Sequence, residues 1–131
     1  MRSYIWDTGP LSLYFAGHQK STTIMNQCLK SEVIGYVPLI ILSEFHYLQW
    51  RHHGERISKM RVDSVLNSTL IISKLEERHI FGIGQYKVRY NQLSLADAAL
   101  SILSKDHNST ILTTETEIPR IKELKSIKIK F

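Results

Sequence analysis

The sequence is poor in cysteine and proline, with one cysteine, Cys28, and three prolines among 131 residues. A single cysteine excludes an internal disulfide framework and a zinc site built from several thiolates. Long hydrophobic runs are also missing, because the longest aliphatic stretch covers only residues 37–42, too few to cross a bilayer. The first seven residues lack the apolar core and the small-residue cleavage site of a signal peptide. We therefore expect a cytoplasmic protein with no membrane partner.

The composition is that of an ordinary globular chain, with 43% hydrophobic and 22% charged residues. No repeat, low-complexity stretch or long linker divides it, so we expect a single domain over residues 1–131. The 17 basic residues outnumber the 12 acidic ones and give a net charge of +5. This excess of positive charge favours a polyanionic partner such as nucleic acid.

Short β-prone runs alternate with helical patterns along the chain. This order predicts an α/β fold, with a mainly parallel sheet and helices on both of its faces. The expected strands are residues 4–6, 34–37, 79–83, 110–114 and 127–131.

The predicted helices follow from apolar periodicity and from capping residues. Thr8 or Gly9 can cap the first helix, with Pro10 at its first position, and Ser21 can cap the second. Gly54 is expected to break the chain between two long helices. The expected helices are one that opens at residues 8–10 and others over residues 21–29, 38–53, 55–74, 94–106 and 119–125.

Glu44 is an acidic residue in an apolar setting. On a helix, its neighbours three and four positions away are Ile40, Ile41, Tyr47 and Leu48. An unpaired carboxylate among such side chains costs several kcal/mol, so something must compensate it. The alternatives to a ligand site are a buried ion pair, or a helix face that is more exposed than the pattern indicates.

Three other acids follow predicted strands. Asp7 comes directly after the first strand, and Glu115 and Glu117 come after the strand at residues 110–114. In parallel α/β sheets, ligands gather at the carboxyl ends of the strands. Alternatively, Asp7 caps the helix that follows it, and the two glutamates are solvated loop acids.

Asp97 has two interpretations. It stands three residues after Ser94 at the start of a predicted helix, which is the spacing of a capping box and gives it a structural role. The same two residues also begin a polar stripe that continues with Ser101 and Lys105, and such a stripe can face a site.

In combination, these acids predict a metal site. Asp7 and Glu115 would lie at one edge of the sheet, while Glu44 and Asp97 lie early on helices that begin near that edge. Carboxylates that converge raise one another's pKa unless a divalent cation neutralises them. Mg²⁺ and Mn²⁺ prefer such oxygen ligands, and they promote phosphodiester hydrolysis. Metal-assisted phosphodiester hydrolysis is therefore the reaction that the pattern favours.

Four segments, residues 7–11, 41–45, 93–100 and 111–115, each contain one of these acids. In order and spacing they resemble the PIN-domain ribonucleases over nearly the whole chain, specifically the VapC-type toxins of prokaryotic toxin–antitoxin pairs. The last segment stands where that family has a Thr-x-Asp element, but Glu115 is longer than aspartate by one methylene. Residues 84–92 also look shorter than the family's usual helix there.

The resemblance implies a three-layer α/β/α fold with about five strands, and an acidic pocket that holds Mg²⁺ or Mn²⁺. It implies that Asp7, Glu44 and Asp97 are catalytic, metal-binding acids. Glu115 would be the fourth, and Glu117 lies close enough in sequence to share or take over that role. The expected activity is a metal-dependent endoribonuclease acting on an RNA substrate.

Other side chains are expected to assist these acids. The supporting polar residues are Thr8, Ser94 and Thr113. Because carboxylates alone repel RNA, basic residues would have to hold its backbone, although a solvated helix surface explains the same residues. The candidates for RNA binding are Arg51, Arg56, Lys59, Arg61, Lys87 and Arg89.

The resemblance also implies two protein partners. Family members form homodimers, and a small VapB-type antitoxin neutralises them by inserting into the acidic pocket. The sequence offers apolar side chains for an interface at Phe45, Leu48, Trp50 and residues 70–72, although core packing explains most of them.

Alternative functions have weaker support. A catalytically silent PIN-like module that binds RNA or protein is indicated only by Glu115. A nucleotide-binding or phosphotransfer domain would need a phosphate loop, and residues 82–84 lack the further glycine and the lysine of such loops. The six histidines are scattered, and adjacent His52 and His53 face different ways on a helix, which does not favour a metal site. Nothing around Cys28 indicates a thiol enzyme.

Overall fold

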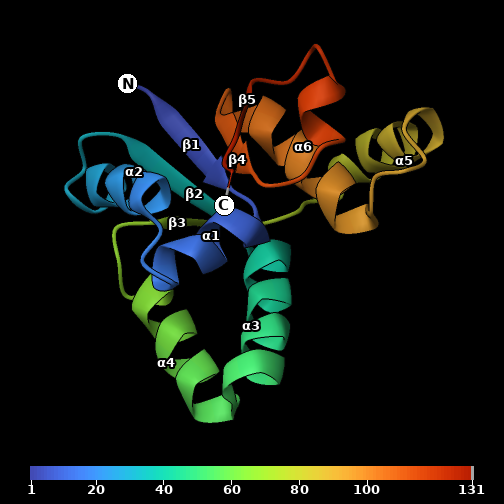
Figure 1. Ribbon diagram of the computed structural model, residues 1–131. Coiled ribbons are helices and arrows are strands. Elements are labelled where there is room, and N and C mark those ends of the chain that lie inside the picture. The colour runs from blue at the N-terminus through green and yellow to red at the C-terminus, as the bar shows by residue number, and fades with distance from the viewer. Residues whose placement is uncertain (131) are drawn as a thin grey trace.

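A sheet of five parallel strands lies at the centre of the computed structural model, which describes residues 1–130 (Figure 1). The strand order is β3-β2-β1-β4-β5, and every neighbouring pair is parallel. Phe131, part of the predicted last strand, lies outside the described residues. The strands are β1 (Ser3–Trp6), β2 (Ile34–Pro38), β3 (Ile71–Ser73), β4 (Thr110–Thr113) and β5 (Ser126–Lys128).

Helices cover both faces of the sheet, which confirms the predicted α/β class (Figure 1). Along β1, Trp6 packs into one hydrophobic cluster with α1, α2 and α4, while Ile5 packs into a second cluster with α5 and α6. Burial on both faces is typical of a parallel sheet. The helices are α1 (Thr8–Phe15), α2 (Gln19–Leu29), α3 (Leu39–His53), α4 (Glu55–Leu66), α5 (His79–Arg89) and α6 (Leu95–His107), with a 3-10 turn at Ile118–Arg120.

The topology places a crevice at the carboxyl end of β1. The chain moves from β1 outward to β2 and β3 on one side, then returns to the other side of β1 for β4 and β5. The order therefore reverses between β1 and β4, and ligands of open α/β sheets bind at such a point. The α3–α4 hairpin projects away from the sheet (Figure 1). No helix among the described residues is long and apolar enough to cross a membrane.

Two predicted elements are wrong. The helix expected over residues 55–74 ends at Leu66, and residues 71–73 form the edge strand β3. The strand expected at residues 79–83 is the first half of helix α5. Glycine in this helix is tolerated because a Cβ on Gly82 would lie 2.8 Å from Cδ1 of Ile102, so glycine allows α5 to approach α6 closely.

The predicted ends of three helices also need correction. Asp7, not Thr8 or Gly9, is the N-cap of α1, which puts Pro10 at the third helical position. Helix α2 begins at Gln19, so Ser21 lies inside it and is buried. The helix expected at residues 119–125 is only the short 3-10 turn.

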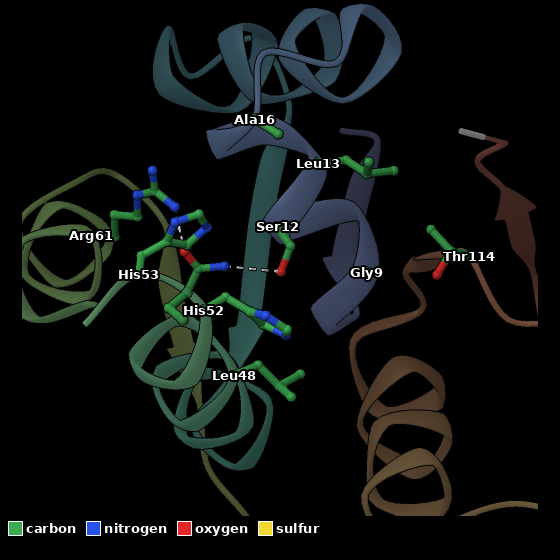
Figure 2. A pocket seen from close by; sticks show the side chains of 10 residues that line it. Gly9, Ser12, Leu13, Ala16, Leu48, His52, His53, Arg61 and Thr114 are labelled. Atoms are coloured by element: carbon green, nitrogen blue, oxygen red, sulfur yellow. Dashed lines mark hydrogen bonds between the residues drawn. The ribbon is translucent and has the colours of Figure 1, made fainter. Parts of the chain in front are cut away.

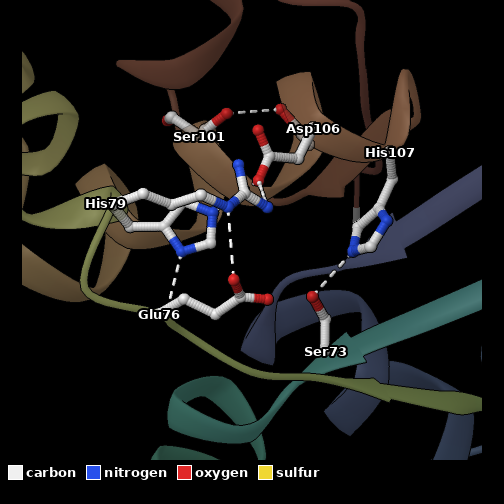
Figure 3. Close-up of polar contacts among 8 residues, drawn as sticks. Ser73, Glu76, His79, Ser101, Asp106 and His107 are labelled. Atoms are coloured by element: carbon white, nitrogen blue, oxygen red, sulfur yellow. Dashed lines mark hydrogen bonds and ion pairs between the residues drawn. The ribbon is translucent and has the colours of Figure 1, made fainter.

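A polar cluster around His79 fixes the start of α5 to the end of α6 (Figure 3). The ring is buried, its Nδ1 accepts a 2.8 Å hydrogen bond from the backbone N–H of Glu76, and its Nε2 bonds to Asp106. Since Nδ1 accepts, the proton of a neutral ring sits on Nε2 and is donated to Asp106. Arg78 adds a 2.8 Å ion pair to the same carboxylate.

Candidate active site

Asp7 lies at the crevice between β1 and β4. Its backbone N–H donates to the carbonyl of Leu112, and the side chain is almost fully buried, with 4% of its surface exposed. Oδ1 accepts a 2.8 Å bond from the N–H of Thr8, and Oδ2 accepts a 2.8 Å bond from the hydroxyl of Thr113. The carboxylate therefore caps α1 and lies at the edge of the sheet where ligands of such folds bind, while its role as a ligand-binding acid stays a prediction.

The electrostatics of Asp7 show that other acids are near. Burial is the largest cause that raises the pKa of Asp7 to about 7, and the charges of Asp97 and Glu44 add to it. The hydrogen bonds from Thr113 and Thr8 favour the ionised form and lower the pKa. These opposing effects place a carboxyl group that titrates near neutral pH at the edge of the sheet.

Glu44 reaches this region from helix α3. Its Oε1 accepts a short hydrogen bond from the hydroxyl of Thr8, one residue after Asp7. The apolar stripe around Glu44 is only partly buried, because Ile41 is buried while Tyr47 is 53% exposed. Within residues 1–130 no basic side chain pairs with Glu44, so a hydroxyl rather than an ion pair compensates it.

Asp97 lies in the first turn of α6. Its N–H donates a 3.0 Å bond to the hydroxyl of Ser94, as in a capping arrangement. Burial raises the pKa of the Asp97 carboxyl most, the bonds with Ser94 lower it, and the charge of Glu44 raises it further. The rest of the predicted stripe does not face the site, since Lys105 lies 3.4 Å from Glu123.

The two glutamates after β4 differ in position. Glu115 is exposed, and its backbone N–H donates a 3.0 Å bond to the hydroxyl oxygen of Thr113, which itself holds Asp7. Glu117 instead forms a 3.6 Å ion pair with Arg120. The structure thus links Glu115 to Asp7 through one threonine and directs Glu117 toward a separate partner.

The donor set fits a hard divalent cation. Asp7, Glu44 and Asp97 supply only oxygen atoms, and their mutual repulsion is what such a cation relieves. In the described part of the chain, however, no three acidic, histidine or cysteine side chains lie close enough together to hold one ion. A shared ion therefore requires at least one of these side chains to rotate.

The predicted basic residues on α3 and α4 differ in their surroundings. Three of them are exposed and bonded locally: Arg51 to the hydroxyl of Tyr47, Arg56 to the sulfur of Met60, and Lys59 to Glu55. Arg61 differs, because it is half-buried, bonds to Gln49 and lines a cavity.

The predicted basic residues on α5 are also occupied. Lys87 donates to the backbone carbonyl of Leu93 at 2.6 Å, and Arg89 lies 3.8 Å from Glu123. Lys87 therefore bonds to the loop between α5 and α6, and Arg89 pairs with the segment before β5.

A cavity of about 450 Å³, which sequence reasoning missed, is lined by the direct neighbours of the two threonines that bond to Glu44 and Asp7 (Figure 2). Gly9 and Thr114 form its wall next to Thr8 and Thr113, while Gln49 and Arg61 belong to the α3–α4 hairpin. A Cβ on Gly9 would lie 2.2 Å from Oγ1 of Thr114, so only glycine allows this close approach. The glycine directly after the Asp7-Thr8 pair was the one sequence signal that could have indicated it.

Comparison with known proteins agrees with this architecture. The family model described as the PIN domain matches residues 4–124. No curated protein sequence matches the chain significantly.

Solved structures with the same fold include toxin–antitoxin proteins. VapBC2 from Rickettsia felis, bound to a DNA fragment from its promoter, has a TM-score of 0.80 at 17% identity and covers 98% of this chain and 99% of its own. DNA-bound VapBC from Salmonella typhimurium has a TM-score of 0.78 at 13% identity, with 98% of both chains covered. The sarcin-ricin loop cleaving toxin VapC20 of Mycobacterium tuberculosis has a TM-score of 0.69 at 16% identity, and the match covers 82% of this chain and 86% of VapC20. At these identities the likeness establishes the fold.

Proposed function

We propose that this chain, which belongs to the PIN domain family, works as one domain and is a divalent-metal-dependent endoribonuclease. The observation that carries the proposal is the buried Asp7 carboxyl at the point where the strand order reverses, with Asp97 and Glu44 close enough to raise its pKa. A buried group with a pKa near neutrality in a crevice is typical of a functional site.

The residues of this chain would divide the work as follows. Asp7, Glu44 and Asp97 would hold Mg²⁺ or Mn²⁺, with Glu115, whose backbone N–H bonds to Thr113, as the fourth acid. A bound ion of this kind acidifies a water molecule and stabilises the charge that builds on a phosphoryl oxygen. Thr113 and the N–H of Thr8 fix the two oxygens of Asp7, so its orientation is set before substrate arrives.

We further propose that the protein is the toxin of a toxin–antitoxin pair, neutralised by a small VapB-type antitoxin. The support is that VapBC complexes share its fold over nearly the whole chain. An antitoxin reading frame beside the gene, whose product copurifies with this chain and blocks RNA cleavage, is the expected finding.

We also propose a homodimer, in which helix α5 supplies apolar surface. Phe81 and Val88 lie seven residues apart on one face of α5 and are 84% and 87% exposed. Of the residues that the sequence suggested for an interface, Phe45 and Leu70 are buried in the core, whereas Trp50 is exposed. Light scattering at micromolar concentration should give twice the monomer mass for the wild-type protein. The Phe81→Ser variant should give the mass of one monomer.

The activity is tested with purified protein, Mg²⁺ or Mn²⁺, and structured RNAs. Wild-type protein should cut the RNA, and Asp7→Asn should abolish cutting. The matched control is Asp63→Asn, an exposed acid on the outer hairpin, which should leave the rate unchanged. Equal cleavage by wild type and Asp7→Asn contradicts the assignment of the site.

A catalytically silent PIN-like module is the second proposal that an observation favours. Glu115 replaces the usual aspartate, and the acids of residues 1–130 do not converge on one ion as they stand. Thermal unfolding with and without Mn²⁺ separates the two functions. An ion that binds the folded state raises Tm, so an unchanged Tm together with no cleavage favours the silent module.

A further inference from the structure

The cavity beside the acids joins two chemically different ends. Gly9 and Thr114 form the end next to the acidic site, and Arg61 and His53 lie at the far end from Thr114 (Figure 2). Leu13 on α1 and Leu48 on α3 contribute apolar wall between them. Its volume of about 450 Å³ falls within the range of small-ligand sites.

Arg61 is held in place as a binding group. Its guanidinium bonds to the side-chain oxygen of Gln49, which is buried, and lies 5.5 Å from the ring centroid of Phe15. Gln49 in turn donates a 3.5 Å bond to the hydroxyl of Ser12. In the described part of the chain Arg61 forms no ion pair, so its positive charge stays uncompensated beside the cavity. A planar guanidinium fixed in this way loses little freedom when it binds a phosphate.

The charged groups that line the cavity indicate which kind of ligand it can bind. None of the residues that line it has a carboxylate, while Arg61, His52 and His53 supply cationic or imidazole groups. An apolar peptide side chain would fill the walls but would offer no acceptor to the donors of Arg61 that Gln49 does not use. A nucleotide satisfies both parts, because its base is flat and apolar on its faces and its phosphate is an anion. Proteins that bind unpaired RNA combine these two contacts.

We infer that this cavity, which we call the α1–α3 pocket, receives the unpaired nucleotide next to the scissile phosphate. The base lies against Leu13 and Leu48, and Arg61 binds the following phosphate. The inference rests on the proposed nuclease function, because the scissile phosphate must then lie at the Asp7 end, next to Thr114. It makes the pocket a determinant of which unpaired base stands beside the cleaved bond.

The test has two arms: in one the base is removed from the RNA, and in the other a substitution in the protein fills the pocket. Abasic nucleotides are scanned along a short, end-labelled single-stranded RNA, and binding is measured in the non-cleaving Asp7→Asn background. One abasic position should weaken binding about tenfold. Ala16→Trp places a large side chain at an exposed lining position, so it should weaken binding of the intact RNA similarly and make that abasic position neutral.

Arg61→Ala is the second variant, and Lys30→Ala is its control, because Lys30 is an exposed basic residue outside the pocket and is not an RNA-binding candidate. Arg61→Ala should weaken RNA binding about tenfold, and Lys30→Ala should change it less than about twofold. Circular dichroism confirms that each variant is folded. Equal RNA affinity for all variants, with or without the base, would contradict the assignment of the pocket to a nucleotide and would favour a polypeptide as its occupant. Absence of RNA cleavage by the wild-type protein would instead contradict the proposed nuclease function. The binding measurements would still show whether the pocket binds a nucleotide.

Discussion

Thr113 donates a 2.8 Å hydrogen bond to Oδ2 of Asp7, which lies 106 residues earlier in the chain. The same hydroxyl oxygen accepts the N–H of Glu115 at 3.0 Å, so its proton is directed at the aspartate. One buried threonine thus connects the ends of the two strands that flank the crevice. It also favours the ionised form of Asp7, the form that a metal ion requires.

Thr113→Val keeps the shape of the side chain and removes the hydroxyl. The pKa of Asp7 should then rise further above about 7, because a hydrogen bond that lowers it is gone. We expect kcat/KM at neutral pH to fall about tenfold, with partial recovery at higher pH. A pH–rate profile measures the shift, and Thr113→Ser should keep the wild-type profile. A profile for Thr113→Val that superimposes on wild type would contradict the role of this bond.

The raised pKa of Asp7 predicts a pH-dependent stability of the metal-free protein. Its folded-state pKa of about 7 exceeds the ordinary aspartate pKa of 3.8, so between these values the folded state binds more protons than the unfolded state. Stability should therefore fall as pH rises through this window, by about 4 kcal/mol at most. Urea unfolding between about pH 5 and about pH 8 measures the slope.

Asp7→Asn removes this titration and should flatten the dependence, so that the variant exceeds wild-type stability above neutral pH and the two converge at lower pH. Asp63→Asn, an exposed substitution, is expected to keep the wild-type slope. A parallel slope for Asp7→Asn and wild type would show that another group titrates.

The parts of the fold with strong local signals were predicted correctly. The strands that pair in the middle of the sheet follow from buried apolar runs, and α6 begins at the Ser94 cap that its sequence indicates. In contrast, the apolar spacing of α4 continues past its true end at Leu66, and strand β3 is only three residues long at the sheet edge. The first half of helix α5 was predicted as a strand because Gly82 lowers helix propensity, whereas in the structure glycine at this position lets the helix pack closely against Ile102 on α6.

The candidate site shows the same division between local and tertiary information. The acids at positions 7, 44 and 97 could be singled out because each is unusual in its local setting, and burial and mutual charge now connect them. The cavity could not be predicted, because its walls come from α1, α3, α4 and the end of β4. These elements come together only through tertiary packing, and no spacing of residues in the sequence indicates that they do.

The glutamates near the crevice should differ in their effect on cleavage. Glu44→Gln keeps an acceptor for the Thr8 hydroxyl but removes the charge near Asp7, so kcat/KM should fall about 100-fold. Glu115→Gln should reduce it to a smaller extent, because the Glu115 side chain is exposed and only its backbone N–H bonds to Thr113. Glu117→Gln is the control and should be close to wild type, because that side chain pairs with Arg120. A loss for Glu117→Gln equal to that for Glu44→Gln would identify Glu117 as the fourth acid.

The His79–Asp106 contact should matter for stability rather than for cleavage (Figure 3). Burial opposes the ionised form of Asp106, but hydrogen bonds from His79 and Arg78 outweigh it and lower the pKa of this carboxyl. A lowered folded-state pKa gives stability that is present above the ordinary aspartate pKa of 3.8 and is lost as pH falls below it. Asp106→Asn should cost about 1–2 kcal/mol at neutral pH, measured by urea unfolding, with kcat/KM unchanged. A drop in cleavage without a drop in stability would contradict this assignment.

Two glycine substitutions should have opposite effects, because their surroundings differ. A Cβ on Gly9 would overlap Thr114, with 2.2 Å to its Oγ1 and 3.0 Å to its Cβ, so Gly9→Ala must push the end of β4 away from α1. We expect a loss of about 1–3 kcal/mol in the free energy of unfolding, together with weaker cleavage as Thr113 moves with its neighbour. Gly84→Ala on α5 has open space around the new methyl group and should stabilise the protein by about 0.5–1 kcal/mol. Urea unfolding of both variants measures the contrast. A Gly9→Ala protein as stable and as active as wild type would show that the contact between α1 and the end of β4 does not set the geometry of the site.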